Sequence, residues 1–76
     1  MNKEQFAVFV SYGLGLRKED RKGFNSYEDA INYAYQRANE IMLSGKRLIK
    51  DNDLHLWTDK DLNKIIRVYN HNFDLV

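Results

Sequence analysis

One apolar stripe, which predicts a single long helix over about residues 27–44, constrains the fold more than any other feature of the sequence. Its apolar residues recur at intervals of three and four, the spacing that lines one face of an α-helix. Ser26 stands where a helix N-cap is expected, and Gly45 stands where a helix stops. Three stripe residues are alanine, so the helix can lie close to a sheet. The stripe consists of Tyr27, Ala30, Ile31, Ala34, Ala38, Ile41 and Met42.

Alternating apolar residues predict strands on either side of this helix. Residues 6–12 place Phe6, Val8, Val10 and Tyr12 on one face and Ala7, Phe9 and Ser11 on the other. Residues 54–58 and 64–69 predict two more strands, joined by the turn 59–63, which contains no glycine. Residues 47–50 could add a short strand by pairing with residues 53–57. The charged stretch 17–23 has no apolar residue, which predicts a solvated loop.

These elements predict an α+β fold in the order β-α-β-β. The expected architecture is a small two-layer sandwich, with the helix packed on one face of a three- to four-stranded sheet. A chain of 76 residues is too short for two independent cores, so we expect a single domain over residues 1–76.

Composition excludes several classes of function. Twelve Lys and Arg against eleven Asp and Glu give a formal charge of +1, which excludes both a polycation and a strongly acidic nucleic-acid mimic. The absence of cysteine excludes disulfides, thiolate metal sites and a thiol nucleophile. The apolar run 6–10 is too short for a signal peptide, and no run approaches a membrane span. We therefore expect a cytoplasmic protein that does not bind membranes.

The residues that usually carry chemistry do not form a motif. The cluster at residues 13–15 has two glycines, but Lys18 stands where a dinucleotide fingerprint needs the third. His55 and His71 lie in different segments without metal-ligand spacing. We therefore predict a protein that is not an enzyme and that holds no metal and no cofactor.

The apolar content points instead to a protein-interaction module. One helix covers only one face of a sheet, so apolar side chains on the other face are available for contacts. Residues 73–76 could fold over that face instead, which the sequence leaves open. The partner would be a larger protein or a second copy, with a homodimer expected for so small a domain. The candidate interface residues, on the sheet face and an edge strand, are Phe9, Trp57, Ile65 and Tyr69.

The small size and the abundance of Asn, Lys, Asp and Tyr are typical of short phage and prophage proteins, which favours an inhibitor or regulator. The alternative function is nucleic-acid binding through the basic loop 17–22. A second basic group, at residues 46–50, lies about one helix length away, on the order of 25 Å, so the two groups should not merge. The candidate residues for this alternative are Arg17, Lys18, Arg21 and Lys22.

Overall fold

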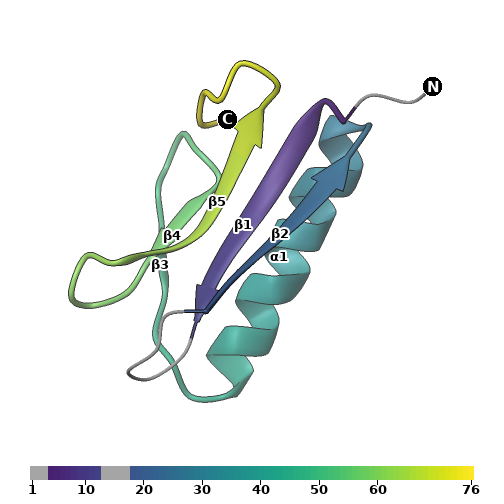
Figure 1. Ribbon diagram of the computed structural model, residues 1–76. Helices are drawn as coiled ribbons and strands as arrows, with labels where there is room; N and C mark the ends of the chain where they lie inside the picture. Colours follow the sequence, from purple (N-terminus) through teal and green to yellow (C-terminus); the bar gives the residue numbers. More distant parts are fainter. Residues whose placement is uncertain (1–3, 13–17) are drawn as a thin grey trace.

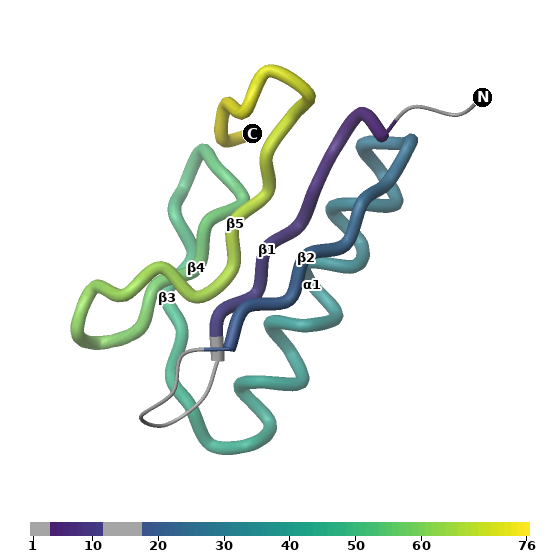
Figure 2. The backbone as a smooth tube through the Cα atoms, in the orientation of Figure 1, coloured from purple at the N-terminus to yellow at the C-terminus, as the bar shows by residue number. Residues whose placement is uncertain are grey.

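A computed structural model describes residues 4–12 and 18–76 of the chain. These residues form one helix and five strands, and the helix covers one face of the antiparallel sheet (Figure 1). The strand order is β2-β1-β5-β4-β3, so the first and last strands of the chain are neighbours (Figure 2). The elements are β1 (Phe6–Tyr12), β2 (Lys18–Phe24), α1 (Tyr27–Leu43), β3 (Ile49–Lys50), β4 (Leu56–Thr58) and β5 (Lys64–Asn70).

The helix α1 confirms the expectation drawn from the apolar stripe. The Ser26 hydroxyl accepts a hydrogen bond from the backbone N–H of Asp29 at 3.2 Å, as an N-cap residue does. The helix ends at Leu43, one residue before the expected end. Gly45 follows with a φ of 105°, a left-handed conformation that favours glycine, and its N–H donates to the carbonyl of Met42.

The core lies between α1 and the two central strands. Ala30, Ala34 and Ala38 are fully buried, and the short side chains let α1 approach the sheet closely. They face branched side chains that alternate along β1 and β5, a pattern that fills the space between helix and sheet. Those branched residues, also fully buried, are Val8, Val10, Ile66 and Val68.

The charged stretch expected to be a solvated loop is instead the strand β2, and it pairs with β1 along its whole length. This expectation was wrong because a strand can be recognised from apolar periodicity only if it buries apolar side chains. β2 is held mainly by its backbone hydrogen bonds and by ion pairs. Two of the pairs link β2 to other elements: Glu19 with Arg67 on β5, and Asp20 with Arg37 on α1. The expected glycine bend at residues 13–15 lies outside the described residues.

The additional strand changes the sheet but not the fold class. The α+β class and the helix on one face are confirmed, whereas the sheet has five strands rather than three or four. The short strand expected near residues 47–50 is present as β3, where Lys50 pairs with Trp57. The strand expected over 54–58 begins only at Leu56.

The C-terminal residues form a second hairpin beside β5. Leu75 pairs with Tyr69, and the N–H of Val76 donates to the carbonyl of Val68 at 3.0 Å. The carbonyl of Val76 in turn accepts from the N–H of His55 at 2.8 Å. The tail therefore lengthens the sheet at this end, and of its apolar side chains Phe73 packs against aromatic rings of the face away from α1.

Replacing a buried alanine of α1 by a larger residue tests the close approach of helix and sheet. Ala34→Leu is expected to lower the free energy of unfolding by about 1–3 kcal/mol, because the added carbons have no space. Urea denaturation followed by circular dichroism measures this loss. Gln36→Leu on the exposed side of α1 is the control; an equal loss in both variants would contradict the packing.

Candidate interaction surface

The sheet face turned away from α1 carries a distinct set of side chains, which we call the open face. Strand pairing defines it, since residues opposite each other in an antiparallel sheet point to the same side. Phe9 lies opposite Arg21 on β2 and opposite Arg67 on β5, while Ala7 lies opposite Tyr69. The open face comprises Ala7, Phe9, Ser11, Glu19, Arg21, Leu56, Arg67 and Tyr69.

Three aromatic rings gather at one end of the open face. The rings of Phe9 and Tyr69 meet edge to face, with centroids 5.4 Å apart and planes at 86°. Phe73, from the tail hairpin, lies 5.3 Å from Tyr69 and 6.4 Å from Phe9. These separations fall in the range of favourable aromatic contacts. Phe73 nevertheless remains 71% exposed, so the cluster is an apolar surface rather than a second core.

Arg67 occupies the middle of the open face. Its guanidinium lies 5.3 Å from the ring centroid of Phe9 and 6.0 Å from that of Tyr69, within cation–π range. Its Nη2 forms an ion pair with Glu19 across β1. Its Nε is buried and has no hydrogen-bond partner among the described residues. The planar, charged guanidinium of Arg67 is therefore held in place on the open face by two aromatic rings and one carboxylate.

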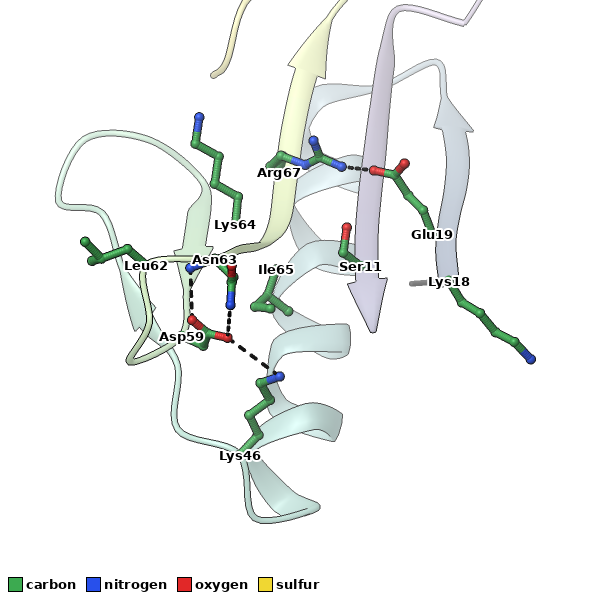
Figure 3. A pocket seen from close by; sticks show the side chains of 10 residues that line it. All are labelled: Ser11, Lys18, Glu19, Lys46, Asp59, Leu62, Asn63, Lys64, Ile65 and Arg67. Atoms are coloured by element: carbon green, nitrogen blue, oxygen red, sulfur yellow. Dashed lines mark hydrogen bonds and ion pairs between the residues drawn. The ribbon is translucent and has the colours of Figure 1, made fainter. Parts of the chain in front are cut away.

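A groove of about 550 Å³ opens at the other end of this face, between β1, β2 and the turn that joins β4 to β5 (Figure 3). Its wall near the helix end contains the ion pair of Lys46 and Asp59, at 3.8 Å. Among the described residues that line it, Ser11 is the one with a hydroxyl, and neither histidine is one of them. The groove thus offers both charged and apolar side chains for contact.

The two hairpin turns that flank β5 have the same hydrogen-bonding pattern. In the first, the carboxylate of Asp59 accepts from the N–H groups of Asp61 and Asn63, both at 2.9 Å. In the second, the amide oxygen of Asn70 accepts from the N–H groups two and four residues later, at 2.9 and 3.0 Å. Each turn is a three-residue loop whose last residue adopts a left-handed conformation.

That left-handed position holds a large apolar residue in both turns. Leu62 and Phe73 each have a φ of 65°, where glycine is usual and a side chain is strained. Both are exposed: Leu62 to 81%, in the wall of the groove, and Phe73 beside the aromatic rings. Strained apolar residues therefore mark both ends of β5, and we call them the two tips.

The structure separates the four interface residues proposed from the sequence. Phe9 and Tyr69 lie half-buried on the open face, as expected. Trp57 and Ile65 are 3% and 5% exposed and belong to the core. The expected placement of Trp57 on an uncovered face was wrong, and Ile65 is buried although it lines the groove. Trp57 faces α1, where its ring meets that of Tyr35 at 5.2 Å, and Ile65 lies at a register shift between β4 and β5.

The candidate nucleic-acid residues are also divided. Arg17 lies outside the described residues, and the other three belong to β2 rather than to a loop. Arg21 points to the open face and is bonded to Glu4, and this hydrogen bond lowers the pKa of the Glu4 carboxyl. Lys22 points to the opposite face, with its ammonium 4.8 Å from the ring centroid of Tyr33. Lys18 shares the side of Lys22, so these cations do not form one patch.

Residues 4–12 and 18–76 contain no cluster of three or more potential metal ligands. In the same residues, α1 is neither long nor apolar enough to cross a membrane. The ring of His55, one of the two imidazoles, lies beside the rings of Tyr27, Tyr35 and Trp57.

Comparison with known proteins adds no relative: no family model, no curated protein and no solved structure matches this chain.

Relieving the strain at a tip tests the turn geometry. Leu62→Gly is expected to raise the free energy of unfolding by up to about 1 kcal/mol, because the left-handed penalty exceeds the backbone entropy that glycine adds. Lys60→Gly, in the same turn, should lower it instead. Thermal unfolding of both variants measures the difference, and equal destabilisation would contradict the left-handed conformation of Leu62.

The hydrogen bonds to Asp59 predict a dependence of stability on pH. Donation from the Asn63 side chain, then from backbone N–H groups, lowers the pKa of Asp59 from its ordinary 3.8. Its ionised form therefore stabilises the fold above pH 3.8, and this stability is lost as the pH falls through the lowered value.

Asp59→Asn should keep the turn, as Asn70 does in the second hairpin, and should flatten the loss of stability below pH 4. Urea unfolding between pH 2 and pH 6 checks this, with Asp61→Asn as the control of equal charge change. An unchanged acid dependence in Asp59→Asn would refute the role of this carboxylate.

Proposed function

We propose that this chain is a non-enzymatic protein-interaction module that binds a partner, a larger protein or a second copy, through the open face. The observation that carries the proposal is the cluster of Phe9, Arg67, Tyr69 and Phe73 on the side of the sheet that α1 does not cover. Such a module would act as an inhibitor or regulator of the protein that it binds.

The chemistry of the cluster supports this proposal. Aromatic residues and arginine supply much of the binding energy of protein interfaces. Aromatic side chains bury large areas with few rotatable bonds, and arginine presents a planar guanidinium with five hydrogen-bond donors. Arg67 is already held between Glu19 and two rings, so little side-chain entropy is lost when a partner covers it. Phe73 and Leu62, at the two ends of β5, expose large apolar surface.

The face supports an interaction better than the strand edges do. The edge strand β2 carries charge at five of its seven positions, and charged residues on an edge discourage the pairing of a further strand. The opposite edge, β3, has two residues and offers few backbone groups. We therefore place the interaction on the open face and no longer on an edge strand.

Nucleic-acid binding through β2 has weaker support. Arg21 already pairs with Glu4, and Lys22 lies against aromatic rings on the other side of the sheet. A phosphate backbone needs several cations on one continuous surface.

Affinity purification from the source cells with quantitative mass spectrometry tests the proposed function. Bait variants Tyr69→Ala and Phe73→Gly should lose a protein that the unchanged chain retains, because both remove parts of the open face. Leu43→Ala is the control, since Leu43 is exposed on α1. Identical partners for all baits, together with a monomer in sedimentation at every concentration, would refute the proposal.

A further inference from the structure

We propose that the open face binds a second copy of this chain in a symmetric dimer, in which Phe73 of each copy enters the groove of the other. This inference rests on the proposed function and names the partner in it. Three features of the face support it: the shapes at the two ends of β5, the balance of charge between them, and the strain at Phe73.

The two ends of β5 have complementary shapes. At one end, the tail turn holds the ring of Phe73, which is 71% exposed. At the other end, beside the turn that joins β4 to β5, lies the groove of about 550 Å³, whose lining includes the apolar residues Leu62 and Ile65 (Figure 1). The strand β5 has seven residues, so its two ends are about 23 Å apart.

A two-fold axis that crosses the strands brings these shapes together. It turns the second sheet end for end, so that the tail turn of each copy faces the groove of the other. Both grooves are then occupied in one closed dimer, and every contact occurs twice. A foreign partner would need a projection and a hollow with the same separation, whereas a second copy has both.

The charges in the middle of the open face are balanced. Arg21 pairs with Glu4, and Arg67 pairs with Glu19, so these four charges sum to zero. A surface without excess charge favours neither an acidic nor a basic partner, and it does not repel its own copy.

The strand register shows where the axis can lie without opposing like charges. One row crosses the three strands β2, β1 and β5 at Asp20, Val10 and Ile66. An axis over this row sets Arg21 of each copy opposite Glu19 of the other, since these two residues flank the row on β2. The same axis sets Arg67 opposite the uncharged Ile65. Opposite charges that meet in this way fix the register of an interface.

Two further charged residues fit this arrangement. Lys64 lines the groove, and Asp74 follows Phe73 in the tail turn. Neither belongs to an ion pair within residues 4–12 and 18–76. The charges of Lys60 and Asp61, in the turn beside the groove, cancel. When Phe73 enters the partner's groove, the carboxylate of Asp74 comes within reach of the ammonium of Lys64.

The strain at Phe73 indicates that its ring is retained for contact. A φ of 65° is a left-handed conformation, which glycine adopts without penalty. Strained residues persist where function requires them. Phe73→Gly should therefore fold about as well as the unchanged chain, because the relief of strain offsets the lost contact with Tyr69.

Sedimentation equilibrium of the full chain over a wide range of concentration tests the inference. The unchanged chain should pass from monomer to dimer and not beyond, because a two-fold contact closes on itself. Phe73→Gly should weaken dimerisation by about tenfold or more. Leu43→Ala, which changes an exposed apolar residue of α1, should dimerise like the unchanged chain.

An exchange of charge tests the placement of the axis. Lys64→Glu alone and Asp74→Lys alone should each weaken the dimer, because each places like charges at both contacts. An equimolar mixture of the two variants should dimerise again, since both contacts of the mixed dimer then join opposite charges. Mixing would not correct a merely structural effect of either substitution.

Three results would overturn the inference: a monomer at every concentration, a dimer that Phe73→Gly leaves unchanged, or a mixture of the charge variants that associates no better than each alone. If the chain is monomeric and the Tyr69→Ala bait still loses a source-cell protein, the proposed function stands and the second copy does not. If that bait loses no protein either, both proposals fail.

Discussion

The contact between the alanine side of α1 and the two central strands determines the rest of the structure. Ala30, Ala34 and Ala38 bring the helix close to β1 and β5, where the valines and isoleucines of one sheet face are buried. A single helix covers only that face, so the other side of the same strands is left to Phe9, Arg67 and Tyr69. Core and interaction surface are therefore two sides of β1 and β5.

Ion pairs extend this arrangement beyond the apolar core. The strand β2 has little apolar surface, and its charges reach partners on both sides of the sheet. Asp20 connects it to Arg37 on the helix side, and Glu19 connects it to Arg67 on the open face. Exposed ion pairs are individually weak, so the backbone hydrogen bonds to β1 contribute most to holding β2 in the sheet. Through Glu19, β2 also holds the arginine at the centre of the proposed surface.

The parts of the fold that depend on local patterns could be predicted from the sequence. Helix α1 with its cap at Ser26 and the alternation along β1 were predicted from apolar spacing, and both are observed. The strand β2 was not, because its partners lie in β1, α1 and β5 and its own residues carry no apolar period. The pairing between the first and last strands, β1 and β5, likewise cannot be predicted from local patterns.

Only part of the candidate surface could be predicted from the sequence. Alternation placed Phe9 and Tyr69 away from the helix, but it failed at Ile65, which is buried at the register shift between β4 and β5. The tips were missed although a signal was present. Each turn begins with Asp or Asn, repeats such a residue two positions later, and then presents a large apolar residue: Asp59–Asn63 and Asn70–Asp74 follow the same order.

The exposure of the aromatic rings to solvent tests the central claim, that one face is covered by α1 and the other is open. A soluble paramagnetic agent added to the dilute, free protein broadens the NMR signals of exposed protons. The ring signals of Phe73 and Tyr69 should broaden strongly, while those of Trp57 and the methyl groups of Val8 should stay sharp. Protection of Phe73 and Tyr69 equal to that of Trp57 would mean that the open face is covered, and it would contradict the account.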